Sequence, residues 1–423
     1  MRLLSQLHTV MLFPMARVIV ELQSRVQQVK SLGKGSICHF ERPYAGQPIM
    51  LLALYQKGAL RPDLKRMLRV AKAQGLYILA VNTLTLKQPE ALQELVDCYI
   101  ERPNFGRDFG SFRTGFLHLF RQKWHKSCPR VLMINDSVYY SSRGLEKFLR
   151  DMMGTQSEVL GATENYEIEY HLGSFCISMA QTVVNAPSFQ RYWTSYRLTD
   201  VRPIVIKQGE MKLSKTLKRC ISAPDQIRAL YGTNWFLTKL KSSPDLQGLL
   251  LEDSRTSSSI LWPRFDISKV TKSLAGRVIV PYYSTAANIE VTTDTPLNEM
   301  HEDALITTRA ELANYLLRHV PDGAQTENFD AILTDALTAV ASEVFMTGSQ
   351  IHQNAAILLE LGLPIIKLDG LYRGAFNNYD LLRLQRKLDP DEAQELSALL
   401  LDRPFGAQML QGWKRAAFMR GLI

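Results

Sequence analysis

The feature that most constrains the fold of this chain is a regular alternation of strand and helix signals between residues 49 and 134. Four short apolar runs of strand length are separated by segments with helical spacing of apolar residues. The runs are 49–55, 76–81, 97–102 and 130–134. Strands that alternate with helices pair in parallel through right-handed crossovers, so the alternation predicts a parallel sheet. Ligands of such open sheets bind beyond the carboxyl ends of the strands.

The segments between the runs have the features of helices, and the pattern becomes less regular after residue 140. Pro62 begins the first helix and Gly75 ends it, which is the usual asymmetry of helix ends. The further expected elements are helices at 89–96, 110–123, 145–153, 188–196 and 210–220, strands at 158–163 and 171–179, an extended stretch at 200–207, and a strand-like run at 278–283. From residue 296 the pattern is mainly helical.

These signals predict three regions. Residues 1–45 form an N-terminal helical segment, and residues 46–254 form an α/β domain. Residues 255–423 form a mainly helical C-terminal region, which begins at the serine-rich stretch 255–259. At 423 residues the chain is long enough for two domains with full hydrophobic cores.

The charge of the chain points to an anionic partner. Its 50 basic and 41 acidic side chains give a formal net charge of +9, which suits a nucleotide, a phosphorylated lipid or a membrane surface. The basic residues are spread without a long Lys/Arg block, so nucleic acid is not the expected partner. The five cysteines lie far apart and form no CxxC or zinc-type pair. We therefore expect free thiols in a reducing compartment.

The first thirty residues predict a helix and neither an export signal nor a membrane span. The apolar run 10–13 ends at Pro14 and is too short for a secretory signal, and no run approaches the roughly 20 apolar residues of a spanning helix. The helix either packs on the protein body or lies as a basic amphipathic helix on the inner face of the cell membrane. In both cases we expect a cytoplasmic location. The residues behind both interpretations are Val18, Leu22, Val26 and Val29, with Arg17, Arg25 and Lys30 between them.

Asp136 follows the fourth apolar run within an Asn-Asp-Ser turn at 135–137. An ionised carboxylate is costly to bury at the end of a strand unless it has a partner. Beside Asn135, a single carboxylate could hold a divalent cation that also binds a diphosphate, because Mg²⁺ keeps several waters and needs few protein ligands. The alternative is a carboxylate that caps a turn or a helix, which is a common role of Asp.

A glycine-rich turn at 104–110 reads NFGRDFG and precedes an expected helix. Gly106 permits close backbone approach, and the N–H groups at the start of a helix favour an anion. Arg107 offers a planar fork for a phosphate or a base edge, while Asp108 could anchor Arg107 or bind a ribose. The spacing matches neither the P-loop nor GxGxxG. The alternative is therefore a tight turn in which Arg107 and Asp108 pair with neighbouring residues.

Glu210 and His171 are the candidates for acid–base chemistry. Glu210 stands at the head of GEMKLSK, where a carboxylate either stabilises the helix dipole or removes a proton from a sugar hydroxyl as general base. His171 begins an expected strand, and a single histidine of this kind is either structural or a group that titrates near neutral pH.

Taken in order, these motifs resemble those of the rhamnan synthesis protein F family of bacterial glycosyltransferases. The resemblance spans residues 48–222 and rests on NFGRDFG, VLMINDSVYY, YEIEYHLGSF, FQRYW and GEMKLSKTL. A further stretch at 349–373 is similar to the C-terminal segment of the family. The resemblance implies a GT-A-like α/β fold with a mixed, mostly parallel sheet flanked by helices. It also implies inverting transfer of a sugar, with rhamnose as a candidate, from a nucleotide-diphosphate sugar to a polysaccharide or O-antigen acceptor.

The resemblance also implies roles for individual residues. Asp136 would face a divalent cation, Mg²⁺ or Mn²⁺, and the diphosphate. Glu210 would be the base, and His171 would lie near a glycan or a lipid-linked oligosaccharide acceptor. The residues implied at the nucleotide-sugar donor are Tyr55, Asn82, Thr83, Asn104, Gly106, Arg107, Asp108 and Asn135.

Two departures from the family pattern keep alternatives open. Ser137 stands where the Asp-x-Asp motif has its second carboxylate, and Gly173 stands where the family more often has glutamine. One alternative is a non-catalytic subunit of a polysaccharide assembly complex. The other is a sugar-phosphate transferase, which would release a nucleoside monophosphate.

Overall fold

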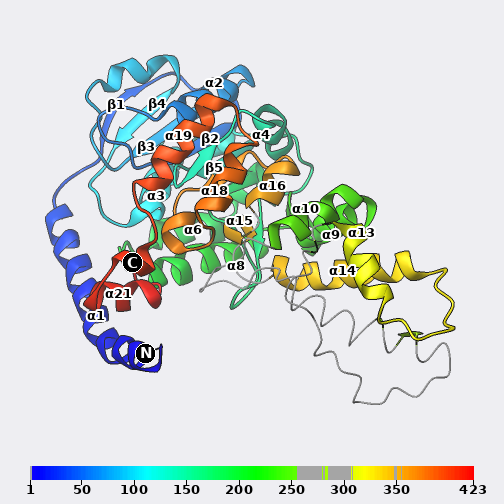
Figure 1. The fold of residues 1–423 in the computed structure, drawn as a ribbon. Coiled ribbons are helices and arrows are strands. Elements are labelled where there is room, and N and C mark those ends of the chain that lie inside the picture. Colours follow the sequence, from blue (N-terminus) through cyan, green and yellow to red (C-terminus); the bar gives the residue numbers. More distant parts are fainter. Residues whose placement is uncertain are drawn as a thin grey trace.

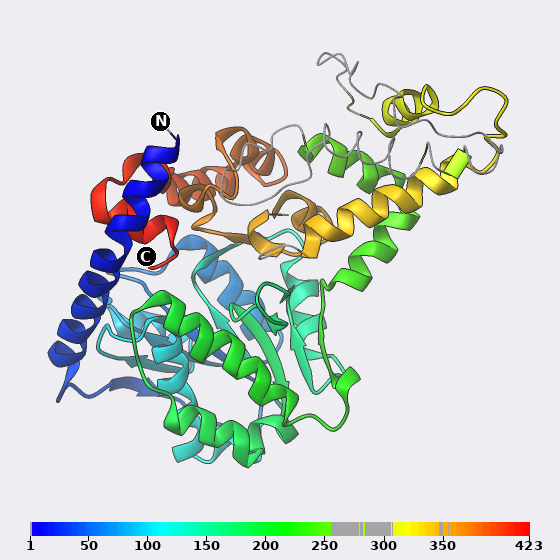
Figure 2. The ribbon, with the colours of Figure 1, turned by 90° about the horizontal axis from the view of Figure 1, so that it is seen from below.

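The computed structural model of the protein describes residues 2–254, 279, 282–283, 306, 308–346, 350–353 and 355–423. The strand-like run expected at 278–283 and the start of the expected C-terminal helices therefore lie largely outside the described residues. Figures 1 and 2 show the fold in two views.

The centre of the molecule is an eight-stranded sheet with the order β1-β4-β3-β2-β5-β10-β7-β11. Its strands are β1 (Ile37–Glu41), β2 (Ile49–Leu54), β3 (Tyr77–Asn82), β4 (Cys98–Glu101), β5 (Arg130–Asn135), β7 (Val159–Gly161), β10 (Cys176–Ala180) and β11 (Ile227–Ala229). The four predicted strands β2 to β5 are parallel, and β1 and β10 run antiparallel to their neighbours. The predicted mixed, mostly parallel sheet flanked by helices is confirmed.

Alternate residues of the central strands face two separate cores. In β2, Met50 and Leu52 belong to the core that contains side chains of α2 (Pro62–Ala73) and α4 (Leu145–Met153). Leu51 belongs to the core on the other face, with side chains of α3 (Arg107–Arg121) and α6 (Pro187–Ser195). A Cβ on Gly115 of α3 would lie 2.2 Å from Leu51 Cδ1, so this helix needs glycine where it crosses the sheet. Burial on both faces explains the continuous apolar runs.

The remaining described elements lie around and beyond this sheet. Between the strands lie η1 (Pro89–Glu94), η2 (Trp124–Lys126), α5 (Gln181–Asn185), α7 (Arg202–Val205), the π-helical η3 (Ile206–Met211), α8 (Lys212–Lys218) and η4 (Pro224–Gln226). The C-terminal part contains α9 (Thr233–Ser242), α10 (Pro244–Ser254), α13 (Arg309–Leu317), α14 (Phe329–Met346), α15 (Gln350–Gln353), α16 (Ala355–Glu360), α17 (Gly370–Arg373), α18 (Asn378–Gln385), α19 (Pro390–Leu401), α20 (Gly406–Met409) and α21 (Gly412–Met419). The predicted helical character of this region is confirmed.

The C-terminal region is tied to the carboxyl edge of the sheet. β12 (Ile365–Lys367) pairs antiparallel with β6 (Val138–Tyr140), which directly follows the Asn-Asp-Ser turn. The buried carboxylate of Glu392 accepts hydrogen bonds from Ser141 Oγ at 3.0 Å and from the Ser142 N–H at 2.8 Å. Residues more than two hundred positions apart therefore meet beside the expected site.

The N-terminal helix α1 (Arg2–Ser31) lies beside α21, so both chain termini are on the same side of the molecule (Figures 1 and 2). It contacts the body through Ala16 and Val20, which share a small core with Ala417. The predicted apolar row, exemplified by Val18 at 56% and Val29 at 66% exposure, faces outward. The helix therefore packs on the body, as one of the two interpretations expected, but it does so through the face opposite to the predicted row.

Two expected elements differ from those observed. The stretch 171–179 is not one strand: β9 (His171–Leu172) pairs with β8 (Glu164–Asn165), and β10 begins four residues later in the main sheet. Gly173 lies between them and its N–H donates to Thr163 O at 2.9 Å, which interrupts the strand. The stretch expected to be extended at 200–207 contains α7, because Pro203 fits the first turn of a helix.

Candidate functional site

The residues predicted from the motifs meet at the carboxyl edge of the sheet. Asn135 ends β5, and its backbone N–H donates to Phe175 O at 3.1 Å. Because β10 is antiparallel to β5 and begins at Cys176, Ser174 lies at the same edge. The strand order therefore brings the 135–137 turn and the 171–175 segment together.

Asp136 joins the ends of two strands. Its Oδ2 accepts hydrogen bonds from the Tyr55 N–H at 2.7 Å and from Gln56 Nε2 at 2.5 Å. Burial raises the pKa of Asp136, while the cation of Arg61 and the two hydrogen bonds oppose that rise. Arg61 donates to the backbone oxygen of Asp136 at 3.0 Å and forms an ion pair with Asp63 at 3.0 Å. Asp136 therefore binds donors of the segment that follows β2, which agrees with the interpretation of Asp136 as a capping carboxylate.

A chain of hydrogen bonds runs along the edge from α3 to the C-terminal region. Asn135 Nδ2 donates to Asp108 Oδ2 at 3.0 Å, and Asn135 Oδ1 accepts from Ser137 Oγ at 2.7 Å. Lys367 Nζ in turn donates to Ser137 Oγ at 2.8 Å. A lysine ammonium therefore stands beside the serine that replaces the second carboxylate of the motif.

The turn at 104–110 is held in an unusual backbone conformation. Gly106 and Arg107 both have positive φ, of 94° and 51°. The Gly106 N–H donates to Asp200 Oδ1 at 2.7 Å, and Arg107 Nε donates to Asp200 O at 2.8 Å. The buried guanidinium of Arg102 binds the carbonyls of Phe105 and Arg107 from inside. Positive φ in a non-glycine residue is costly and is concentrated at functional sites.

Four arginines lie near this turn and interact through their charges: Arg107, Arg202, Arg373 and Arg403. Burial lowers the pKa of Arg107; the carboxylates of Asp108 and Asp200 oppose this effect, and the charges of Arg373 and Arg403 add to it. Burial lowers the pKa of Arg373 in the same way, with a contribution from Arg202. Like charges held together in this manner attract an anion such as a phosphate or a diphosphate.

Glu210 and His171, predicted separately, face each other. Glu210 Oε1 accepts a hydrogen bond from Ser174 Oγ at 2.8 Å, and Glu210 Oε2 lies 3.9 Å from His171 Nε2. The carbonyl of Glu169 lies 2.8 Å from His171 Nδ1 and can only accept, so Nδ1 carries a proton. The side chain of Glu210 is 30% exposed, which leaves it accessible to a ligand.

The π-helical segment η3 positions Glu210. A Cβ on the preceding Gly209 would lie 2.8 Å from the ring of Phe109, so the backbone approaches α3 closely at this point. Tyr192 Oη donates to Gln208 O at 3.1 Å and to Gly209 O at 3.2 Å. π-Helical turns occur frequently at functional sites.

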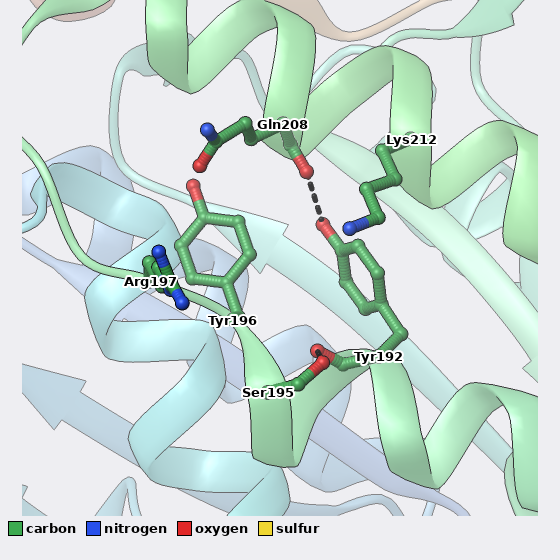
Figure 3. A pocket seen from close by; sticks show the side chains of 6 residues that line it. All are labelled: Tyr192, Ser195, Tyr196, Arg197, Gln208 and Lys212. Atoms are coloured by element: carbon green, nitrogen blue, oxygen red, sulfur yellow. Dashed lines mark hydrogen bonds between the residues drawn. The ribbon is translucent and has the colours of Figure 1, made fainter.

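A cavity of 370 Å³ lies between the end of α6 and the segment 208–212 and is shown in Figure 3. Burial raises the pKa of Tyr196, and the charges of Asp108 and Glu210 add to the rise, so its hydroxyl lies near both carboxylates. Tyr196 Oη is buried and has no hydrogen-bond partner in the described chain. An unpartnered hydroxyl of this kind suits a polar ligand such as a sugar. The cavity is lined by Tyr192, Ser195, Tyr196, Arg197, Gln208 and Lys212.

The other predicted donor contacts differ in accessibility. Tyr55 directly follows the last residue of β2, and 60% of its surface is exposed. Asn104 is also exposed. Asn82 is fully buried; its Oδ1 accepts from the Gln56 N–H and its Nδ2 donates to Gln56 O and Tyr99 Oη. Thr83 Oγ1 faces Leu54 O at 3.4 Å. Asn82 and Thr83 therefore join neighbouring strand ends in this structure.

The donor atoms around Asp136 fit a divalent cation poorly. Asp136 is the single carboxylate of the turn, and its Oδ2 already accepts two hydrogen bonds. Asn135 Oδ1 is engaged by Ser137, and Ser137 Oγ accepts from the ammonium of Lys367. A hard cation in proteins takes oxygen ligands with free lone pairs. The cation that contacts this turn is the ammonium of Lys367.

Several residues of the site escaped prediction from sequence. Asp200, Arg202 and Arg403 stand in no recognisable motif, and Lys367 and Arg373 lie in the stretch 349–373 without having been singled out. The resemblance of 349–373 to a family segment was the one signal for this region, and it did not single out Lys367.

Comparison with known proteins gives matches to part of the chain. Uncharacterized protein y4gN of Sinorhizobium fredii is 27% identical over 175 residues, which cover 40% of this chain and 45% of that protein. Virulence protein VirA of Vibrio anguillarum is 29% identical over 119 residues, 28% of this chain and 38% of that protein. The chain thus spans less than half the length of these curated relatives. No solved structure matches it. Residues 76–220 match the model described as Rhamnan synthesis protein F, so the predicted resemblance is confirmed over this segment.

Proposed function

We propose that the protein is a glycosyltransferase of the GT-A kind, which moves a sugar from a nucleotide-diphosphate sugar to a glycan or lipid-linked acceptor of a bacterial polysaccharide. Rhamnose is the candidate sugar suggested by the family description. The observation that carries the proposal is the convergence of two groups at one edge of the sheet. The Arg107 cluster with Lys367 suits a diphosphate, and the Glu210–His171 pair suits an acceptor hydroxyl.

In the proposed reaction, Glu210 accepts the proton of the acceptor hydroxyl as that oxygen attacks the anomeric carbon. The bond between this carbon and the diphosphate breaks, and its electron pair leaves with the nucleoside diphosphate. Ser174 Oγ–H fixes one oxygen of Glu210, and the other remains free to take the proton. Arg107 and Arg373 stabilise the negative charge that develops on the leaving group, which is usually the largest electrostatic contribution.

We propose further that transfer proceeds without a divalent cation. The lone Asp136 and the ammonium of Lys367 at Ser137 support this proposal over the cation expected from sequence. The cation remains a testable alternative: addition of a chelator should leave the rate unchanged, whereas a metal-dependent enzyme would lose activity.

The direct test of the catalytic role uses Glu210→Gln, which keeps the size of the side chain and its contact with Ser174 but cannot accept a proton. With a panel of uridine, deoxythymidine and guanosine diphosphate sugars, we expect a loss of about 10²-fold or more in nucleoside diphosphate release. Donor affinity should not change. The control is Glu167→Gln, an exposed glutamate between β8 and β9, which should retain wild-type activity.

The two alternative functions predict different patterns of nucleotide release. A non-catalytic subunit would release no nucleotide from any donor, and a sugar-phosphate transferase would release the monophosphate. Either product pattern would overturn the proposal. The Asp136 contacts described above are the observation that most favours a non-catalytic role, because they engage the family's metal residue within the protein.

We also propose a peripheral location on the cytoplasmic face of the membrane. No helix of the described chain is long and apolar enough to cross a membrane. The outward row of α1 combines exposed Val18, Leu22 and Val26 with the cation of Arg25 on the same helix. An apolar row with adjoining cations suits an anionic lipid surface, where a lipid-linked acceptor would be found.

A further inference from the structure

Four side chains with metal-binding atoms meet at the opposite edge of the sheet from the site described above. Cys38 and Glu41 belong to β1, Cys98 begins β4, and His118 belongs to α3. Because β4 is one of the parallel strands, its first residue lies at the amino edge of the sheet. This cluster has no part in the proposed transfer reaction.

A β-bulge brings the ligand atoms to one face. Cys38 is opposite Ile100 and Glu41 is opposite Cys98, with a register shift between Cys38 and Phe40. In a regular strand, side chains three positions apart point to opposite faces, whereas the extra residue turns Cys38 and Glu41 to the same face as Cys98. That face is covered by α3, from which His118 reaches the cluster.

Three distances between the ligand atoms are close to those of a tetrahedral zinc site, and Cys38, Glu41 and Cys98 hold their ligand atoms within 4.8 Å of one another. Zn–S bonds of about 2.3 Å and Zn–N or Zn–O bonds of about 2.0–2.1 Å place two sulfurs about 3.8 Å apart and a sulfur and a nitrogen or oxygen about 3.5 Å apart. Here Cys38 Sγ lies 4.0 Å from Cys98 Sγ, and Cys98 Sγ lies 3.8 Å from both Glu41 Oε2 and His118 Nε2.

The shortest distance in the cluster has a simple explanation. His118 Nε2 lies 2.6 Å from Glu41 Oε2, which is a hydrogen bond and is shorter than the separation of two ligands on one metal. A proton between these atoms holds them together, and a metal ion that replaced the proton would move them apart by less than about 1 Å. Such a movement is small for Glu41, which is exposed.

From these four residues we infer a structural Zn²⁺ site made by Cys38, Glu41, Cys98 and His118. The ligand set is of the sulfur and nitrogen type that zinc prefers, and a fourfold protein set leaves no open position for catalysis. Surrounding groups suit it: Gln122 Nε2 donates to Glu41 Oε1 at 3.1 Å, and Arg121 lies near Cys38 and His118, where its charge offsets the thiolates. The ion would fasten β1, and with it the exit of α1, to the sheet and to α3.

The chemical rival at this place is a disulfide between Cys38 and Cys98. All five cysteines are free in the structure, and a disulfide would need the sulfurs to approach to about 2.05 Å. A disulfide would make no use of the carboxylate and the imidazole that face the two sulfurs. The metal explains all four side chains, so we favour it.

The test measures bound zinc in the whole chain purified without chelator, by elemental mass spectrometry, together with Co²⁺ titration of the metal-stripped protein. We expect one zinc per chain and a sulfur-to-cobalt charge-transfer band. The variant Cys98→Ser should lose both, and the matched control Cys176→Ser, another buried strand cysteine, should keep both. Cys38→Ser provides a second variant at an exposed position, in case Cys98→Ser does not fold.

Three results would overturn the inference. One is wild-type protein that contains no stoichiometric zinc and gives no cobalt band. Another is zinc content that is unchanged in folded Cys38→Ser and Cys98→Ser. The third is a mass two protons lighter with a Cys38–Cys98 linked peptide in protein purified under reducing conditions, which would establish the disulfide in place of the metal.

Discussion

At the scale of single residues, Asp136 is best understood through the groups that it holds. Its Oδ2 accepts hydrogen bonds from the Tyr55 N–H and the Gln56 side-chain amide just after the end of β2, although burial raises the pKa of Asp136. A carboxylate with a raised folded-state pKa gives no net stabilisation from its charge, because ionisation is easier in the unfolded chain. The hydrogen bonds, and not the charge, are therefore the contribution of Asp136 to stability.

Two substitutions of Asp136 should therefore differ in their effect on the free energy of unfolding. Asp136→Asn keeps an oxygen for both donors, and we expect it to change the free energy of unfolding by less than about 1 kcal/mol. Asp136→Ala leaves two buried donors unpaired and should cost about 1–3 kcal/mol. Denaturant unfolding of both variants measures the difference. Equal losses in the two variants would mean that the charge itself stabilises the turn.

At Asp369 the favourable charges outweigh the effect of burial, which leads to a prediction for how stability depends on pH. Burial opposes its ionisation, but His352, Lys367 and Arg373 outweigh that effect and hold the pKa of Asp369 well below its ordinary value. Its stabilisation is complete above the unfolded-state pKa of about 3.9 and is lost as the pH falls through the lower folded-state value. Asp369→Asn should therefore destabilise the protein by about 1–3 kcal/mol at neutral pH, and the difference should shrink in strong acid.

Thermal unfolding of Asp369→Asn and wild type across this pH range checks the prediction. The exposed Asp322→Asn serves as the control and should follow wild type throughout. A difference that stayed constant down to acid pH would contradict the ion-pair explanation.

At the scale of elements, some strands and helices follow from the local sequence pattern, whereas others depend on tertiary contacts. The apolar runs predicted β2 to β5 because both faces of those strands are buried. The break between β9 and β10 was not predictable, because it depends on the contact of Gly173 with Thr163, which lies between β7 and β8. The bulge in β1 is equally hidden, since it arises from pairing with β4. For α1 the periodicity predicted a helix correctly but assigned the buried face wrongly.

The outward face of α1 leads to a prediction for membrane binding. Wild-type protein should sediment with vesicles that contain anionic lipid and much less with neutral vesicles, because the helix offers both apolar side chains and cations. Val18→Ser combined with Leu22→Ser should abolish the binding, while both residues are exposed and their replacement should leave the fold intact. Binding that is equal for the double variant and wild type would exclude α1 as the contact.

At the scale of the whole molecule, the C-terminal region completes the candidate site. β12 delivers Lys367 to the 135–137 turn, and α17 delivers Arg373 to the cluster around Arg107. The motifs allowed prediction of Asp108, Asn135, Glu210 and His171 as members of one site, and the structure brings these four to one edge. The distant cations could not be predicted, because no local pattern relates residues more than two hundred positions apart.

The central claim is that this edge of the sheet binds the diphosphate of a nucleotide sugar, and calorimetry with nucleoside diphosphates tests it most directly. The protein should bind at least one of the uridine, deoxythymidine and guanosine diphosphates, with or without chelator. Lys367→Met should weaken that binding about tenfold or more, equivalent to about 1.4 kcal/mol. Lys387→Met, which removes a lysine that pairs with Glu360 elsewhere, should bind like wild type. Absence of binding to every diphosphate, or equal affinity in folded Lys367→Met and wild type, would contradict the account.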